Sequence, residues 1–451
     1  MNQTELEIRY GTSSFMYTEY PHKTFWPKNP NQKEFIESLL DLSSINNFSP
    51  ALLYIHIPFC HKQCLFCTCH VIIEKNYDAI TEYIDYLSKE ITLLKETLNK
   101  NQATLNITEI HLGGGSPTYL KPNEFNKLMD LLSDICDLNK LNEFSIEIDP
   151  RRIDEDRMKY YATKGITRVS FGIQDFDPKV QKAIARVQPK ELTEKLISDD
   201  LRILFPGGVN FDLLIGLPFQ TLSSFTSTLE EVISLSPDRI CMNYMHLSSK
   251  FHPHQLKMPL DTLPSFSEKK TMFTLAVEML SKQGYERTGY DHFAKSSDTM
   301  TQAKNLGKMS WNRLGVTTGD YESCIGLGVS STGTLGEKYY YQNMFDLTAY
   351  YASLNNNNFP VENSVKLCDE DNLRRTVIQD IRNYFEVDKK SISSQFEIEF
   401  DRHFNEEILN LQKYITDELV IISEEKILIT STGEQFANLI ASTFDTYIVQ
   451  T

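Results

Sequence analysis

Short apolar runs alternate with amphipathic stretches through the first two thirds of the chain. Between the runs, apolar residues recur at the three- and four-residue steps of a helix, most clearly at Ile80, Tyr83, Ile84, Leu87, Ile91 and Leu94. Parallel strands need helical crossovers, so six such repeats predict an α/β fold, a parallel sheet with helices outside that is open or closed into a partial (β/α)6 barrel. The six predicted strands are 52–57, 107–112, 144–149, 169–173, 209–215 and 239–245.

The pattern also predicts how the chain is divided. Residues 1–45 lack a clear period and are predicted to form an N-terminal arm, and residues 46–300 the partial barrel. Residues 301–364 are predicted to form a segment that connects the barrel to the rest of the chain and covers the substrate. Within it, the run 339–341 is expected on the surface and 355–358 as a linker. Besides the helix that contains Ile80, helices are predicted at about 122–136, 154–164, 190–204, 222–235 and 266–284.

Residues 365–451 are predicted to form a small C-terminal domain. Helical periods at about 370–384 and 404–415 precede two short β runs, 419–423 and 426–430, and a last helix from Thr432. Helices followed by a hairpin resemble a winged helix. From residue 366 onward, however, there are 9 Lys and Arg against 17 Asp and Glu, the wrong sign for contacts with phosphates. A docking or substrate-covering role fits better.

Composition narrows the class of protein. The chain has 451 residues with 45 basic and 61 acidic side chains, hence a formal charge of −16, which argues against nonspecific nucleic-acid binding and attraction to anionic membranes. With 41% hydrophobic residues it is globular. Residues 1–10 do not resemble a signal peptide, and no apolar run approaches the length of a membrane span. We therefore expect a cytoplasmic protein.

Four of the eight cysteines fall within ten positions, directly after the first predicted strand: Cys60, Cys64, Cys67 and Cys69. The Cys-x3-Cys-x2-Cys spacing lets one short loop bring three thiolates to three irons of a cubane, which leaves the fourth iron open to a small molecule. Ordinary electron-transfer clusters use four cysteines, and structural zinc uses paired knuckles separated in sequence. Zinc, unligated cysteines and Cys69 as a fourth ligand remain alternatives.

Polar residues stand where the predicted strands end. Gly113–Gly115 and Ser116 follow the second strand, and three glycines allow a backbone to approach a ligand closely. Glu147 and Asp149 are predicted to end the third strand, Gln174 and Asp175 the fourth, and Asp212 the fifth. The carboxyl ends of parallel strands carry the chemistry of β/α folds, so these residues are candidates for a binding site. Taken singly, each also fits a tight turn or a helix cap.

The segment Tyr54-Ile-His-Ile-Pro-Phe-Cys60-His-Lys-Gln-Cys64-Leu-Phe-Cys67-Thr-Cys69 resembles the signature of radical S-adenosylmethionine (SAM) enzymes. In particular it is similar to oxygen-independent coproporphyrinogen III oxidases, and the similarity runs from about Tyr17 to Tyr447. The resemblance implies a partial barrel of the radical SAM type, a [4Fe–4S] cluster on Cys60, Cys64 and Cys67, and the binding of two SAM molecules.

The same resemblance implies roles for individual residues. Tyr54 and Cys69 are the catalytic candidates, although Cys69 could equally be a ligand, a radical-quenching group or inert. The implied contacts of the two SAM molecules are Tyr54, Phe66, Gly114, Gly115, Ser116, Glu147, Gln174, Arg186, Asp212, Met245 and Thr332. Three of these replace the family's residue: Ser116 stands for threonine, Met245 for alanine and Thr332 for isoleucine. Arg186 is suited to pair with a carboxylate.

The largest departures from the family's pattern lie on the substrate side. The N-terminal Arg-Tyr-Thr-x-Tyr-Pro motif begins with Met16 here, and the Arg-Asn-Phe-Gln segment reads Trp311-Asn-Arg313-Leu314. A substrate with four propionates calls for Arg or Lys donors, and Arg313 could supply a displaced charge. The expected reaction is decarboxylation of coproporphyrinogen III to protoporphyrinogen IX in haem biosynthesis. Radical methyl transfer or cyclopropanation of a heterocycle, and a haem-binding chaperone, are the alternatives.

The resemblance also implies partners. We expect a porphyrinogen or other small-molecule substrate and a reductant such as flavodoxin or ferredoxin. We expect a monomer that contacts neither nucleic acid nor membrane.

Overall fold

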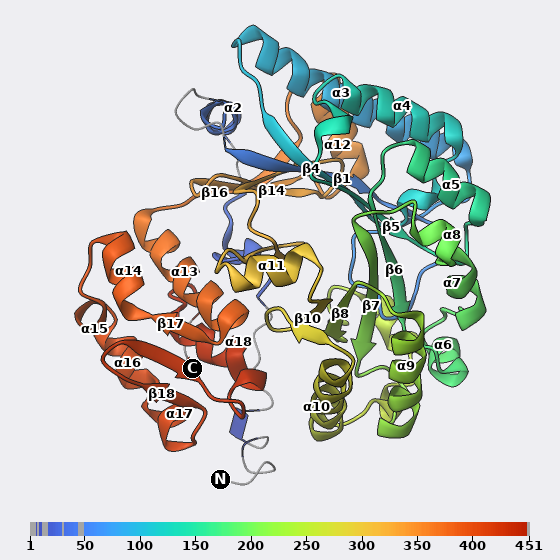
Figure 1. The fold of residues 1–451 in the computed structure, drawn as a ribbon. Coiled ribbons are helices and arrows are strands. Elements are labelled where there is room, and N and C mark those ends of the chain that lie inside the picture. The colour runs from blue at the N-terminus through green and yellow to red at the C-terminus, as the bar shows by residue number, and fades with distance from the viewer. Residues whose placement is uncertain (1–5, 7–8, 11–16, 29–30, 44–48, 449–451) are drawn as a thin grey trace. The chain divides into compact units, whose positions relative to one another are not determined.

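The computed structural model describes residues 6, 9–10, 17–28, 31–43 and 49–448. The chain divides into two compact units (Figure 1). The first, here called the barrel unit, comprises Pro27–Leu263 and Asp320–Lys366. The second, the C-terminal unit, comprises Met1–Trp26, Pro264–Gly319 and Leu367–Thr451. The segment boundaries expected from the sequence, at residues 45, 300 and 364, stay a prediction.

The six predicted strands are confirmed, and they lie side by side in the order in which they occur along the chain. Every neighbouring pair is parallel. The carboxyl ends of all six strands therefore meet at one edge of the sheet, where the candidate residues of the sequence stand. The strands are β1 (Pro50–Ile57), β4 (Asn106–Gly114), β5 (Glu143–Ile148), β6 (Arg168–Gln174), β7 (Gly208–Ile215) and β8 (Arg239–Tyr244).

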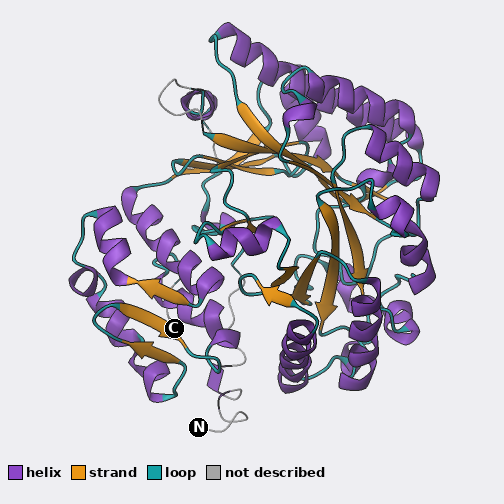
Figure 2. Cartoon of the chain, in the orientation of Figure 1, coloured by secondary structure: helices purple, strands orange, loops and turns teal. Residues whose placement is uncertain are grey.

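Helices cover the outer side of this sheet (Figure 2). They are α3 (Tyr77–Lys100), α4 (Pro122–Ser133), α5 (Glu155–Thr163), α6 (Pro178–Ala183) and α9 (Leu222–Leu235). All six apolar residues that predicted α3 are buried, which confirms the face assigned to it. The helix expected at 190–204 is instead two, α7 (Lys190–Leu196) and α8 (Asp199–Arg202). Ser198, a residue type common at helix N-caps, precedes α8 with a non-helical ψ of 155° and separates the two helices.

Four further strands extend the sheet beyond β1: β13 (Ser323–Leu327), β14 (Thr332–Leu335), β15 (Tyr339–Asn343) and β16 (Val361–Lys366). β13 is parallel to β1, and each of the next three strands is antiparallel to the strand before it. The surface location predicted for 339–341 is wrong, because all three tyrosines are buried. Both faces of β15 are covered, and Phe35 of α2 (Gln32–Asp41) packs against the Tyr339 and Tyr341 rings.

The predicted linker at 355–358 lies inside the barrel unit. It is the turn between α12 (Leu347–Asn355) and β16. Asn357 takes a left-handed conformation there with a φ of 55°, which asparagine tolerates.

In the C-terminal unit, α10 (Phe266–Lys282) confirms the helix expected at 266–284, and α13 (Asp369–Tyr384) confirms the helix expected at 370–384. β18 (Val420–Ile422) and β19 (Lys426–Ile429) form the predicted hairpin, to which β17 (Glu386–Asp388) adds an antiparallel third strand. The remaining elements are β9 (Tyr285–Arg287), β10 (His292–Lys295), α11 (Thr299–Asn305), β11 (Ser310–Asn312), β12 (Gly315–Thr317), α14 (Lys389–Phe396), α15 (Phe400–His403), α16 (Asn405–Asn410), α17 (Gln412–Thr416) and α18 (Ala437–Ala441).

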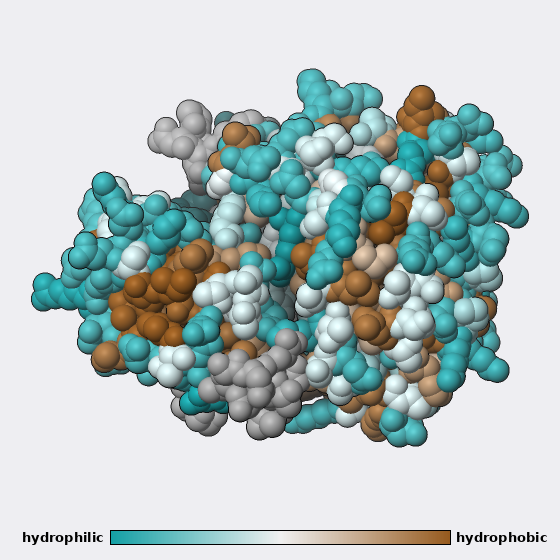
Figure 3. All heavy atoms as spheres, turned by 60° about the horizontal axis from the view of Figure 1, so that its bottom comes forward, coloured by the Kyte–Doolittle hydropathy of each residue, from teal (hydrophilic) through white to brown (hydrophobic). Residues whose placement is uncertain are grey.

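Described residues of the predicted N-terminal arm fall in both units: those from Pro27 onward belong to the barrel unit, and those up to Trp26 belong to the C-terminal unit. Tyr17 donates a hydrogen bond to Asp445 at 2.8 Å, and Arg9 pairs with Asp417 at 2.8 Å. Figure 3 shows apolar side chains gathered on part of the surface; in this unit the exposed large apolar residues include Ile421 and Leu428, which face each other across the hairpin. Among the described residues, no helix is long and apolar enough to cross a membrane.

Candidate functional site

The cysteine loop starts where β1 ends. Residues Phe59–Cys60 (β2) pair with Ile72–Ile73 (β3) and close the loop at its base. Within the loop, Cys67 N donates to the Cys64 carbonyl at 3.2 Å. The Cys64 side chain is buried, those of Cys60 and Cys67 are half-buried, and that of Cys69 is exposed. The loop thus holds three thiols at the carboxyl edge of the sheet and leaves the fourth accessible.

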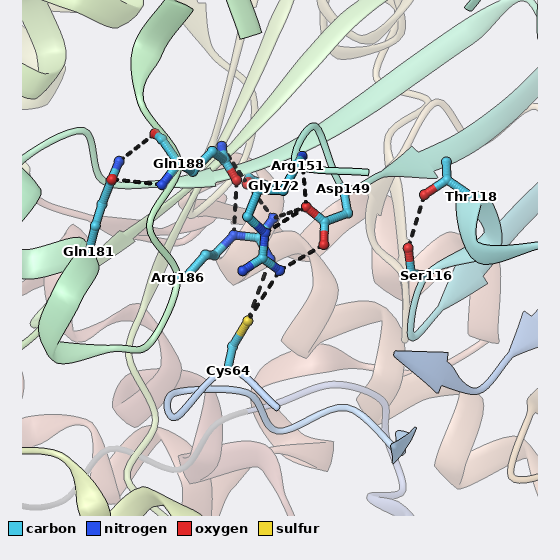
Figure 4. Close-up of polar contacts among 9 residues, drawn as sticks. All are labelled: Cys64, Ser116, Thr118, Asp149, Arg151, Gly172, Gln181, Arg186 and Gln188. Carbon is cyan, nitrogen blue, oxygen red and sulfur yellow. Dashed lines mark hydrogen bonds and ion pairs between the residues drawn. The ribbon is translucent and has the colours of Figure 1, made fainter. Parts of the chain in front are cut away.

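Two guanidinium groups converge on the sulfur of Cys64 (Figure 4). Arg186 Nη1 lies 3.6 Å from Cys64 Sγ, and Arg151 Nη2 lies 3.8 Å from it. N–H donors to a metal-bound sulfur orient the ligand and stabilise the charge that it carries when bound. The surroundings of Cys64 therefore suit a thiolate ligand of an iron–sulfur cluster.

Both arginines are held in place by other groups. Asp149, directly after β5, accepts hydrogen bonds from Arg151 Nε at 2.8 Å and Nη2 at 2.7 Å. Arg186 donates to the Gly172 carbonyl at 2.7 Å and to Gln188 Oε1 at 3.2 Å. Burial alone would raise the pKa of Asp149, but the hydrogen bonds and charges of the two arginines outweigh it and hold that pKa below its usual value. The Asp149 carboxylate stays charged and fixes both guanidiniums.

The thiol of Cys60 is neutral in the absence of metal. Burial raises its pKa to about 12, and the charges of Cys64 and Asp149 act in the same direction. Bound iron reverses this preference, because a coordinating thiol is deprotonated. Among the described residues no three His, Cys, Asp or Glu side chains converge to hold a single ion. The thiolates of a cubane stand farther apart than the ligands of a single ion, since each of them binds a different iron.

The glycine triplet packs against the cysteine loop. A Cβ on Gly115 would lie 2.7 Å from the Pro58 carbonyl oxygen and 2.9 Å from that of Phe59, so only glycine fits. Gly114 has a φ of 119°, which also requires glycine. The Gly115 amide donates to the Ile57 carbonyl at 2.8 Å, and the Gly114 amide to Glu147. These glycines thus allow close approach, but to the backbone that leads into Cys60.

A polar network links Glu147 to Tyr54. Glu147 Oε2 accepts from Gly114 N at 3.0 Å, and Oε1 lies 3.3 Å from His111 Nε2. His111 Nδ1 lies 2.7 Å from Ser145 Oγ, and its ring stacks on Tyr54 with centroids 5.8 Å apart. Tyr54 in turn contacts His56 Nδ1 through its hydroxyl at 2.9 Å. The network fixes the Glu147 carboxylate and the Tyr54 ring beside the glycine triplet.

A second polar group lies on β6 and β7, and Asp212 stands within β7 rather than at its predicted end. Asp212 accepts from Ser170 Oγ at 3.2 Å and from Asn210 Nδ2 at 2.9 Å. Gln174, at the end of β6, has a φ of 67°. Such strained backbone is typical of functional sites. Asp175 is instead structural: it is fully buried, which raises its pKa to about 6, and it ties the strand end to Gln220 at 2.7 Å.

The remaining described candidates lie elsewhere in the barrel unit. Phe66 and Met245 pack against one apolar cluster of the barrel unit. Ser116 is buried and lies 2.9 Å from Thr118 Oγ1, as Figure 4 shows. Thr332 stands on β14, two strands from β1 in the sheet. Met16, which replaces the family's arginine, lies outside the described residues.

Several residues of the site were missed by the sequence reasoning, among them His111, Ser145 and Arg151. His111 and Ser145 are polar residues within otherwise apolar strands, a signal that could have identified them. Arg151 follows Asp149 by two positions, and its proximity to a cysteine 87 positions away has no local signal.

Comparisons with known proteins show the family of the chain. A family model described as the radical SAM superfamily matches residues 54–232. The chain is 34% identical to oxygen-independent coproporphyrinogen III oxidase of Helicobacter pylori over 98% of this chain and 95% of that protein. It is 33% identical to the Escherichia coli enzyme of the same name over 98% and 94%. A solved structure of coproporphyrinogen III oxidase from Escherichia coli matches with a TM-score of 0.88 and 32% identity, covering 96% of this chain and 97% of that one.

Proposed function

The chain belongs to the family of oxygen-independent coproporphyrinogen III oxidases within the radical SAM superfamily, and we propose that it decarboxylates two propionates of coproporphyrinogen III to the vinyl groups of protoporphyrinogen IX. The observation that carries this proposal is the cysteine loop after β1, whose central thiol receives two guanidiniums, in a chain that matches such oxidases over 98% of its length. The reaction is a step of haem biosynthesis.

Cys60, Cys64 and Cys67 would hold the [4Fe–4S] cluster, with Cys69 left free of it. When bound, cluster and SAM supply a 5′-deoxyadenosyl radical that takes a hydrogen atom from the β-carbon of a propionate. Arg151 and Arg186 stabilise negative charge on Cys64, through the contacts at 3.8 and 3.6 Å. The cluster would then lie at the carboxyl edge of the sheet, where all six parallel strands end.

The residues proposed to bind SAM have matching chemistry. The Glu147 carboxylate, fixed by Gly114 N and His111, is an acceptor for a ligand ammonium group, and Asp212 is an acceptor for hydroxyl groups. Arg186 offers guanidinium donors to a carboxylate. The other proposed contacts are Tyr54, Phe66, Gly115, Ser116, Gln174, Met245 and Thr332.

The substrate's propionates require cations, and the C-terminal unit contains several. Trp311 stands where the family has arginine, but the Arg382 guanidinium lies 4.0 Å from its ring centre. Arg313 lies 3.6 Å from the Glu19 carboxylate. Burial and the charge of Arg313 lower the pKa of Lys23 to about 8. We propose Arg313 and Lys23 as displaced propionate partners, since a carboxylate beside them would pair with both cations and raise the pKa of the lysine again.

The direct test is a product assay. The protein is reconstituted with iron and sulfide without oxygen, then incubated with SAM, dithionite and coproporphyrinogen III and examined by mass spectrometry. We expect protoporphyrinogen IX, formed by loss of two carbon dioxide molecules, together with 5′-deoxyadenosine. Absence of both products would refute the proposal.

A second candidate function is radical methyl transfer or cyclopropanation of a heterocycle. The substitutions at Trp311 and Leu314, on the substrate side, favour it. The same assay separates the two, because cleavage of SAM with an intact porphyrinogen would leave the radical chemistry and overturn the substrate. A haem titration tests the third alternative, a haem-binding chaperone, which requires stoichiometric binding without turnover.

We also propose the finer properties of the protein. A net charge of −16 supports a protein that binds neither nucleic acid nor membrane. We propose a cytoplasmic location, a monomeric state, and reduction by a small electron carrier such as flavodoxin or ferredoxin. Gel filtration and cell fractionation test the first two.

A further inference from the structure

Three segments of the barrel unit that border the cysteine loop contain no acidic residue. They are residues 55–73, which include the loop, residues 178–190, and residues 243–260 after β8. In the same segments there are seven Lys and Arg, whereas the whole chain has 45 basic and 61 acidic side chains. The sign of the charge is therefore reversed locally, around the cysteines.

These segments are joined in space. His254 Nε2 lies 2.8 Å from the Cys67 carbonyl, and Gln255 donates to the Phe66 carbonyl at 3.1 Å. On the other side of the loop, Leu65 N donates to the Ile184 carbonyl at 3.0 Å. Side chains from all three segments also share one apolar cluster. The lysines they carry thus surround one loop.

The surface formed in this way combines exposed cations with exposed apolar side chains. Phe251 is 72% exposed and Leu256 is 59% exposed. Such exposure is unusual for two large apolar residues of one short segment. Among the residues that the structure describes, the four lysines of this surface form no ion pair with a carboxylate. We call this surface the cluster face; it consists of Lys62, Lys182, Lys250, Phe251, Leu256 and Lys257.

We propose that the cluster face is the docking surface of a small acidic electron-carrier protein that reduces the iron–sulfur cluster. The proposal rests on the proposed function, which needs one electron for each SAM cleaved. That electron leaves the reduced centre of the carrier and enters the cluster; no bond forms or breaks, and no atom is transferred. Docking here brings the carrier to the outer side of the loop, next to the exposed Cys69.

Charge complementarity selects this occupant. Four unpaired lysines attract an acidic protein and steer its approach, while Phe251 and Leu256 provide an apolar contact at short range. A nucleic acid would meet the same lysines, but the rest of the chain carries more than sixteen excess negative charges and repels it. Nucleic-acid binding is therefore an outcome that the test must exclude.

The test measures how fast a carrier reduces the cluster. The full-length, reconstituted protein is mixed in a stopped-flow instrument with reduced flavodoxin, an acidic carrier, and the bleaching of cluster absorbance is followed. The variant combines Lys62→Glu, Lys250→Glu and Lys257→Glu. The control is Lys366→Glu, an equal charge change per residue on β16, at the opposite edge of the barrel unit's sheet.

We expect the triple variant to be reduced by flavodoxin about tenfold or more slowly at low ionic strength, and the difference to vanish at high salt, where charges are screened. The control should match the wild type. Dithionite, which needs no docking, should reduce all proteins at one rate. An unchanged flavodoxin rate in the triple variant, an equal loss with dithionite, or tight binding of single-stranded DNA by the wild type that the triple variant loses would overturn the proposal.

A second variant tests the apolar part. Phe251→Ser should slow reduction by flavodoxin without changing its salt dependence, because it removes contact area and no charge. Failure of the proposed function is recognised separately. If dithionite-driven protein leaves coproporphyrinogen intact while the lysine variants still lose flavodoxin reactivity, the substrate is wrong and the docking surface stands.

Discussion

Replacement of Arg151 by methionine isolates one of the two guanidiniums at Cys64. Methionine has similar length but neither charge nor donor. The change removes the N–H contact to Cys64 Sγ at 3.8 Å and both hydrogen bonds to Asp149. Arg186 then remains as the single cation near the sulfur, 3.6 Å away. We expect the cluster to assemble, because the three cysteines and their loop are unchanged.

The magnitude follows from the charge of the cluster. Reduction adds one negative charge, so a neighbouring guanidinium stabilises the reduced form more than the oxidised form. A hydrogen bond to a charged group contributes about 1.5–3 kcal/mol, and a long contact to a delocalised charge contributes less, about 1 kcal/mol. For one electron this corresponds to about 40 mV. We therefore expect the midpoint potential of the Arg151→Met cluster to be about 40 mV more negative.

The assay is a redox titration of the reconstituted protein followed by electron paramagnetic resonance, with iron content measured on the same samples. Arg152→Met is the matched control, since Arg152 is exposed and adjacent in sequence. It should leave the potential unchanged. An unchanged potential in Arg151→Met with full iron content would refute the role assigned to this arginine, as would an equal shift in the control.

Three further variants test the site and its support. Cys64→Ala should abolish the iron–sulfur absorbance, whereas Cys324→Ala, on β13, should keep it; an unchanged spectrum and iron content in Cys64→Ala would contradict the ligand assignment. Gly115→Ala places a methyl 2.7 Å from the Pro58 carbonyl oxygen, so we expect a loss of about 1–3 kcal/mol in unfolding free energy and weaker iron binding; a normal melting curve would contradict the close packing. Burial raises the pKa of Glu90 to about 7 despite the hydrogen bonds that its carboxylate accepts. The folded protein therefore retains a proton that the unfolded chain releases near pH 4.5. The free energy of unfolding should fall by about 3 kcal/mol as the pH rises between these two values. Glu90→Gln should flatten that slope in urea titrations at several pH values, and an equal slope in both proteins would count against it.

The arrangement of the parallel strands could be predicted from the sequence because each strand and helix has its own local pattern of apolar residues. Apolar runs of strand length alternate with periodic helices, and parallel pairing then follows from the crossovers. The buried face of α3 was identified from the spacing of Ile80 to Leu94 alone. Glu147 was placed near the carboxyl edge for the same reason, whereas Asp212 lies within β7 and not at its end.

Features that depend on distant parts of the chain could not be predicted. Tyr339–Tyr341 read as a polar surface run, yet antiparallel pairing with β14 and β16 buries them. The approach of Arg151 to Cys64 depends on how the β5 end faces the cysteine loop, which no local pattern encodes. Likewise, the glycine triplet was expected to face a ligand, and the structure shows that Gly115 accommodates the Pro58 backbone.

The most direct measurement of the central claim uses coproporphyrinogen III labelled with deuterium at the β-carbons of its propionates. The reconstituted protein is incubated with this substrate, SAM and dithionite, and the recovered 5′-deoxyadenosine is examined by mass spectrometry. The account predicts deuterium in 5′-deoxyadenosine together with loss of carbon dioxide from the porphyrinogen. Unlabelled 5′-deoxyadenosine beside an intact porphyrinogen would contradict it.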